Sequence, residues 1–138
     1  MALSYLKEMQ EALIGLEPRE MLGELIEIGK GLSQLPEELC SDDNRVSGCV
    51  SEVHIIAHLD RHGNIIYEGR ADSLIVRGYL AILITALSGM KPQEIVQHAE
   101  KEVMRFTSET NITVSMIQSR ANAFSNVFKK MIKLAGAL

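Results

Sequence analysis

The sequence has only two cysteines, Cys40 and Cys49, among its 138 residues. We expect the protein to be cytoplasmic. In the cytoplasm thiols are kept reduced, and a lone disulfide is unusual. A disulfide between Cys40 and Cys49 would close a short loop, but it is disfavoured for the same reason. Both side chains are therefore expected to be free thiols.

Basic clusters and long apolar runs are also missing. The net charge is -4, and no basic stretch is long enough to follow a phosphate backbone, which argues against a nucleic-acid partner. The longest apolar run, from Tyr79 to Leu87, is far shorter than the roughly 20 residues that cross a bilayer, so no membrane partner is expected. Lys7 and Glu8 interrupt the first apolar stretch. We therefore expect no signal peptide and a mature chain that begins at Met1.

Apolar residues make up 46% of the chain, enough to form one core, so we expect a single domain over residues 1–138. Apolar positions at helical spacing predict helices over residues 3–16, 18–32, 73–88, 92–106 and roughly 114–134. Pro18 and Pro92 suit the first turns of two of these helices, and Asp72 or Ser73 would cap the third. The 73–88 segment is apolar almost all round, which predicts a helix packed centrally against a sheet.

Alternating apolar residues from Val53 to Leu59 predict a strand with one buried face. Residues 60–64 then form a turn, and a partner strand runs from residue 65 to 69. A short extended piece around Val46 is expected to supply a third strand, because two strands alone are marginal in water. The predicted fold class is α+β, with a small antiparallel sheet of about three strands packed against several helices.

The segment Asn44-Arg45-Val46-Ser47-Gly48-Cys49-Val50-Ser51 places a cysteine where a polar loop meets a strand. A thiolate that attacks a sulfur held on another protein must reach into a foreign pocket, and small residues make the backbone thin and bendable. Gly48 can also adopt a positive φ without steric cost. Arg45 and, if the fold brings it near, Arg120 would lower the pKa of the thiol. From these residues alone Cys49 is either an exposed nucleophile or a small buried hydrophobe.

The other candidate ligands are expected to be structural. Cys40 follows a helical-looking fragment and is interpreted as a packing residue. His54, His58 and His62 recur at intervals of four, but on a strand four residues span roughly 13 Å, so they cannot share one ion at about 2 Å. We therefore predict no metal site and no cofactor.

Segments spread along the chain resemble the SufE-type sulfur acceptors, a family that includes the CsdE group. The matching segments, in order, are Leu35–Pro36, Asn44–Val53, Gly69–Ser73, Val76–Ala81, Ser88–Ile95 and Ser119–Asn122. They cover nearly the whole chain, which makes the resemblance far more specific than a Gly-Cys pair.

This resemblance implies an α+β fold shared with IscU-like cluster scaffolds. It implies that Cys49 receives persulfide sulfur from the pyridoxal-phosphate-dependent cysteine desulfurase SufS, stimulates that enzyme and delivers sulfur to a SufBCD-type scaffold for iron–sulfur cluster assembly. Such a carrier has no independent turnover. The residues implied to support the loop or bind the partner are Arg45, Gly48, Ser51, Asp72 and Arg120.

Two positions depart from the family pattern, and two other functions stay open. His54 stands where the family usually has tryptophan, and Ala123 where it usually has glycine, so the partner is either SufS-like or CsdA-like.

An IscU-like cluster scaffold would need about four protein ligands, mostly thiolates, and two cysteines cannot supply them. A non-catalytic interaction module would keep partner binding after Cys49→Ser. We expect a monomer or a weak homodimer.

Overall fold

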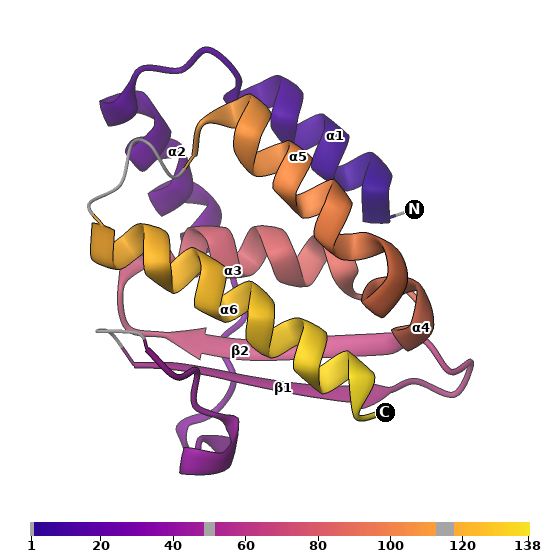
Figure 1. The fold of residues 1–138 in the computed structure, drawn as a ribbon. Coiled ribbons are helices and arrows are strands. Elements are labelled where there is room, and N and C mark those ends of the chain that lie inside the picture. Colours follow the sequence, from indigo (N-terminus) through magenta and orange to yellow (C-terminus); the bar gives the residue numbers. More distant parts are fainter. Residues whose placement is uncertain (1, 49–51, 113–117) are drawn as a thin grey trace.

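A computed structural model describes residues 2–48, 52–112 and 118–138, and it confirms the α+β class (Figure 1). The elements in chain order are α1 (Ala2–Leu13), α2 (Pro18–Lys30), the 3-10 turns η1 (Glu37–Leu39) and η2 (Asp42–Asn44), β1 (Val53–Leu59), β2 (Ile65–Ala71), α3 (Leu74–Leu87), α4 (Pro92–Glu94), the π-helical turn η3 (Ile95–Ala99), α5 (Glu100–Thr110) and α6 (Gln118–Gly136). Each predicted helix and both hairpin strands have a counterpart in this order.

The sheet is a single hairpin. β1 and β2 pair antiparallel, with Val53 opposite Ala71 at the open end. Asp60 shapes the turn, because its carboxylate accepts hydrogen bonds from the backbone N–H of His62 at 2.8 Å and of Asn64 at 3.0 Å. The bond from Asn64 is also the main reason why the pKa of Asp60 lies below its usual range.

The third strand expected around Val46 is present as a bridge. Arg45 forms an isolated antiparallel bridge with His54, and the N–H of Val46 donates to the carbonyl of Val53 at 2.8 Å. The turn η2 ends just before Arg45, and Gly48 has a φ of +81°. Too few residues are extended between these two points to form a strand, so the sheet has two strands in the part of the chain that is described.

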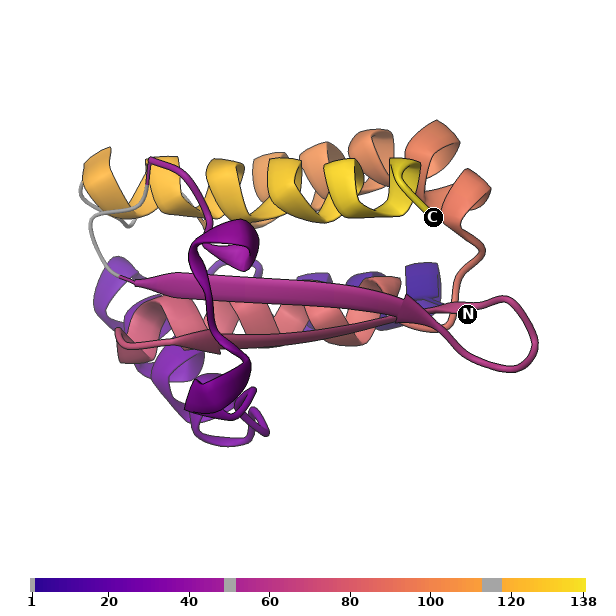
Figure 2. The same ribbon diagram turned by 90° about the horizontal axis from the view of Figure 1, so that it is seen from below.

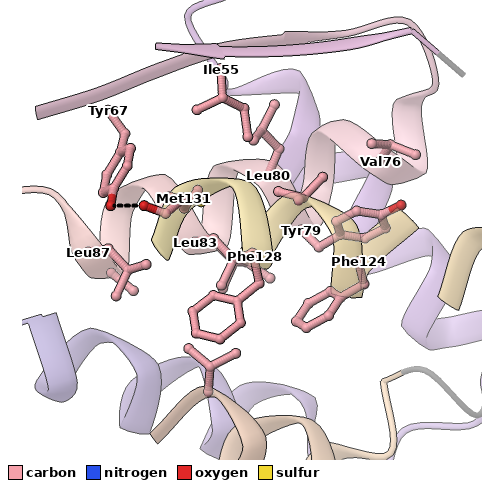
Figure 3. Close-up of a cluster of buried hydrophobic side chains, with 14 of the residues drawn as sticks. Ile55, Tyr67, Val76, Tyr79, Leu80, Leu83, Leu87, Phe124, Phe128 and Met131 are labelled. Carbon is pink, nitrogen blue, oxygen red and sulfur yellow. Dashed lines mark hydrogen bonds between the residues drawn. The ribbon is translucent and has the colours of Figure 1, made fainter. Parts of the chain in front are cut away.

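The core lies between one face of the sheet and the helices α3 and α6, which run beside it (Figures 1 and 2). Ile55 on β1 and Tyr67 on β2 point into this core and are buried. The hydroxyl of Tyr67 donates a hydrogen bond to the carbonyl of Met131 on α6 at 2.7 Å (Figure 3). Tyr79 of α3 contacts Phe124 of α6 edge-on, with 5.3 Å between the ring centroids. Ten of the fourteen residues of α3 are buried, as expected for a central helix.

Helices α2 and α3 approach each other at two glycines. A Cβ on Gly78 would lie 2.2 Å from the carbonyl oxygen of Leu25, and one on Gly29 would lie 2.7 Å from the carbonyl oxygen of Leu74. Real Cβ atoms do not come this close to a backbone oxygen, so only glycine allows the two helices to pack at this separation.

The helix expected over residues 92–106 is divided into α4, η3 and α5. The π-helical turn keeps Ile95, Ala99 and Val103 on the buried side of this bent segment.

Among the described helices none is long and apolar enough to cross a membrane alone. The pair Leu74–Leu87 and Pro92–Thr110 meets the length and composition requirement only together, with a bend of 118° between its members.

Candidate functional site

Cys49 and Ser51 lie outside the described residues, so the site is defined by the chain on either side of them. Val46 and Val53 are both buried and are joined by the backbone hydrogen bond described above. The described chain on either side of Cys49 is therefore joined at the base of the segment formed by residues 46–53. We call this segment the cysteine loop.

Asn44 and His54 tie the base of the cysteine loop together through their side chains. The Oδ1 of Asn44 accepts a hydrogen bond from the N–H of Ser41 at 3.0 Å, and its Nδ2 donates to the carbonyl of Leu39 at 2.8 Å. The Nδ1 of His54 lies 2.8 Å from the Oδ1 of Asn44 and 3.1 Å from the carbonyl oxygen of Ser41. Because both of these oxygens are acceptors, Nδ1 carries the hydrogen in this arrangement.

Helix α6 contacts the cysteine loop at Gly48 and the turn before it at Asp43. Gly48 lies against Asn126, since a Cβ on Gly48 would be 2.7 Å from the Asn126 Nδ2 atom. One turn later Lys130 donates from its Nζ to the carbonyl of Asp43 at 3.1 Å. The positive φ of Gly48 and this narrow space both explain why glycine precedes Cys49.

Asp72 lies next to the other end of the cysteine loop. Its N–H donates to the carbonyl of Glu52 at 3.3 Å, three residues after Cys49. Arg77 holds the chain at this point, because its guanidinium donates to the carbonyls of Ala71 at 2.7 Å and Asp72 at 3.4 Å. The structure thus brings Asp72 to this end of the loop through its backbone, while its side chain is exposed.

Arg45 and Gly48 border a shallow hollow of about 390 Å³ beside the cysteine loop. The side chain of Arg45 is exposed. Arg120 lies in the first turn of α6, and its side chain is outside the described part of the structure. The effect of either arginine on the pKa of Cys49 therefore stays a prediction.

A separate cavity of about 340 Å³ lies between the η1–η2 segment and the hairpin. Its lining consists of Glu37, Cys40, Ser41, Asp42, Glu52, His54, Arg70 and Asp72. Cys40 is a partly buried free thiol whose sulfur donates to the carbonyl of Pro36 at 3.7 Å. Burial raises the pKa of this thiol, and nearby carboxylates, first that of Glu37, add to the rise, while Arg70 opposes it. The raised pKa disfavours the thiolate, which is the nucleophilic form of Cys40.

Arg70, which lines this cavity, is hydrogen-bonded to two neighbours. The guanidinium of Arg70 donates to the carbonyl of Leu35 and to the carboxylate of Glu37, each at 3.2 Å. Across the described ranges no group of three or more histidine, cysteine, aspartate or glutamate residues is arranged to hold a metal ion.

The sequence matches the profile of a known protein family along almost its whole length. The profile described as "SufE: Fe-S metabolism associated domain" matches residues 7–135. The chain belongs to the SufE family. Its membership places it in iron–sulfur metabolism, as the resemblance of the sequence segments implied.

Relatives of this SufE protein come from bacteria and plants. It is 39% identical over 115 residues to an uncharacterized SufE-like protein of Synechocystis sp., a match that covers 83% of this chain and 69% of the relative. It is 31% identical over 118 residues to SufE-like protein 1, chloroplastic/mitochondrial, of Arabidopsis thaliana, covering 86% of this chain. The chain spans only 30% of the length of that plant protein.

A solved structure shares the fold of this SufE protein. The solution structure of a hypothetical protein from Thermus thermophilus superposes with a TM-score of 0.71, and the match covers 96% of this chain and 94% of the other. The two sequences are only 15% identical, so the likeness concerns the fold.

The contacts around the SufE cysteine loop include residues that the sequence did not reveal as part of the site. Asn126 and Lys130 are four positions apart, which places them on one face of α6, but the spacing does not show what that face contacts. Asn44 lies inside the recognised motif, and His54 is a departure from the family pattern. These two features were the available signals for the side-chain link at the base of the loop.

Proposed function

We propose that this SufE protein receives persulfide sulfur on Cys49 from a cysteine desulfurase, stimulates that enzyme and delivers the sulfur for iron–sulfur cluster assembly. The observation that supports the proposal is the match of the family across residues 7–135, which includes Cys49 and the segments on both sides of it. A SufS-like or CsdA-like desulfurase is the proposed donor, and a SufBCD-type scaffold is the proposed recipient.

The chemistry is a thiolate exchange. The Cys49 thiolate attacks the outer sulfur of the persulfide on the desulfurase, a new S–S bond forms on Cys49, and the original S–S bond breaks. The electron pair of the broken bond leaves on the desulfurase cysteine, which becomes a thiolate again. No external oxidant or reductant is consumed, because the sulfur atom keeps its oxidation level in the transfer.

The contacts around the cysteine loop suit this role. Val46 and Val53 are bonded at its base, Gly48 lies close against Asn126, and the N–H of Asp72 is bonded to the carbonyl of Glu52. Because the described ends of this segment are attached to the fold, less entropy is lost at these ends when the segment enters a partner. Cys40 lacks this placement, and its raised pKa disfavours the thiolate at neutral pH.

Intact-protein mass spectrometry after incubation with a cysteine desulfurase and cysteine tests the proposal. We expect the protein to gain one sulfur atom, and peptide mapping to locate it on Cys49. Cys49→Ser should abolish the gain and the stimulation of the desulfurase while leaving the fold intact. Cys40→Ala is the matched control and should change transfer little.

Two results would count against the proposal. Sulfur found on Cys40 alone would show that the wrong thiol had been assigned. Full stimulation of the desulfurase by Cys49→Ser would identify the protein as a binding module whose cysteine takes no part in transfer.

A further inference from the structure

We propose that Asn44 and His54 are positioning residues, which orient the cysteine loop for transfer by closing its base. This inference rests on the proposed function, because it concerns the same loop. Neither side chain reaches the reacting sulfur in this proposal. They act through the backbone that leads to Cys49.

The side-chain amide of Asn44 is hydrogen-bonded through both its oxygen and its nitrogen. Its Oδ1 accepts two hydrogen bonds, from the Ser41 N–H and from the His54 imidazole, so both lone pairs of this oxygen are used. Its Nδ2 holds the carbonyl of Leu39. One side chain therefore fixes the turn η2 and connects it to β1. A residue that only capped the turn would not need the bond to the strand.

The bond between Asn44 and His54 lies at the base of the cysteine loop. His54 directly follows Val53, and Asn44 is separated from Val46 by one residue, so their bond lies next to the backbone bond that closes the loop. Val46 and Val53 are buried and fix the depth of the base. The bond between Asn44 and His54 lies outside the core and adds a side-chain link between η2 and β1 to the contacts already described at Val53, Gly48 and Glu52. We infer that this link restricts the direction in which the chain leaves η2 toward Cys49.

Loss of either side chain should have little effect on the stability of the fold. Both side chains are only partly buried, and the main apolar cluster does not include them. Their removal should therefore leave the core intact. What changes is how much order the partner must impose on the loop when it binds. The expected consequence is a weaker apparent affinity with an unchanged maximal rate.

The test compares four variants in a desulfurase stimulation assay. His54→Val removes the imidazole donor from the strand, and Asn44→Ala removes the other half of the pair from an exposed turn. His54→Asn keeps an N–H donor at the position of Nδ1. His58→Val is the matched control, because His58 lies on the same face of β1 but contacts Glu68 at 3.2 Å, away from the loop.

We expect His54→Val and Asn44→Ala to raise the protein concentration for half-maximal stimulation about five- to tenfold, the effect of losing one or two hydrogen bonds. The maximal rate should stay within twofold of that of the unaltered protein. His54→Asn should recover most of the loss, and His58→Val should behave like the unaltered protein. Amide hydrogen exchange should become faster in residues 41–48 of the first two variants, and stay unchanged in the β1–β2 ladder.

The failures are distinguishable. Faster exchange in residues 41–48 with unchanged half-saturation and rate would show a purely structural link and overturn the positioning role, while the sulfur acceptor function would stand. Equal losses in His54→Val and His58→Val would also overturn it. If the unaltered protein neither stimulates a desulfurase nor gains sulfur, the proposed function fails first and the positioning role falls with it. If His54→Val does not fold, the half-maximal concentration measured for Asn44→Ala tests the positioning role.

Discussion

Gly48 lies against the side chain of Asn126, 78 positions further along the chain, so closely that a Cβ on the glycine would be 2.7 Å from the Nδ2 atom. The backbone of this glycine also has a φ of +81°, a value that residues with a side chain rarely adopt. These two constraints act on the residue directly before the proposed sulfur-accepting cysteine. They are separate in origin, and substitutions can separate them.

Gly48→Ala should weaken both folding and sulfur transfer. The backbone strain should lower the free energy of unfolding by about 1 kcal/mol, and the contact with Asn126 should add a displacement of the loop. Gly15→Ala is the matched control, because Gly15 has a φ of +78° and no atom within 4 Å of its added Cβ. Equal transfer rates for the two variants would show that the Asn126 contact has no influence on the loop. Denaturant unfolding and a desulfurase assay measure the two effects.

Gly78→Ala should be among the most destabilising small substitutions in the protein. Its Cβ would lie 2.2 Å from the carbonyl oxygen of Leu25, so the helices α2 and α3 must separate. We expect a loss of about 3 kcal/mol in the free energy of unfolding, comparable to strong overpacking. Gly23→Ala in α2 is the control, since its Cβ meets nothing within 4 Å and should stabilise the helix by up to about 1 kcal/mol. Equal effects of the two substitutions would contradict the close approach.

Tyr67→Phe should reduce stability and change its pH dependence. Loss of the hydrogen bond to the Met131 carbonyl should lower the free energy of unfolding by about 1 to 2 kcal/mol near neutral pH. Burial raises the pKa of Tyr67 well above its usual value of 10.0. The neutral phenol is therefore favoured in the folded state, so this contribution is present below pH 10 and falls as the pH rises beyond it.

Urea unfolding at pH 8 and at pH 10.5 checks this pH dependence. The unaltered protein should lose more stability between the two values than Tyr67→Phe does. A part of the loss should persist in the variant, because burial also raises the pKa of Tyr5. Identical pH profiles for the two proteins would show that the Tyr67 phenol does not resist ionisation in the fold.

Cys40 should react slowly with iodoacetamide at pH 7.5. Its pKa is raised by burial and by neighbouring carboxylates, so little thiolate is present at this pH. In a Cys49→Ser background, which isolates this thiol, Glu37→Gln should speed the reaction and Arg70→Leu should slow it. Mass spectrometry measures the rate of alkylation in the Cys49→Ser protein and in the two variants made in it. Reaction as fast as that of free cysteine would refute the assigned environment.

Helix α3 and the hairpin illustrate what the sequence predicts well. The apolar run of α3, the alternation in β1 and the polar turn at Asp60 each depend on neighbours close in the chain. Such local patterns determine element type almost independently of the rest of the fold. The ends of elements were predicted less well, because capping and packing decide them. The helix expected to reach residue 16 ends at Leu13, and the third strand is a single bridge at Arg45.

The sequence by itself determined the class of the fold, the family and the cysteine that we propose as the acceptor, because a motif and an apolar period are properties of residues near one another in the chain. Only the tertiary structure decided which side chains surround that cysteine loop. Asn126 and Lys130 reach it across more than seventy residues, and His54 turns its Nδ1 toward Asn44. Such contacts depend on how α6 and β1 are packed in the folded protein. A local pattern of residues does not determine which distant segments come into contact.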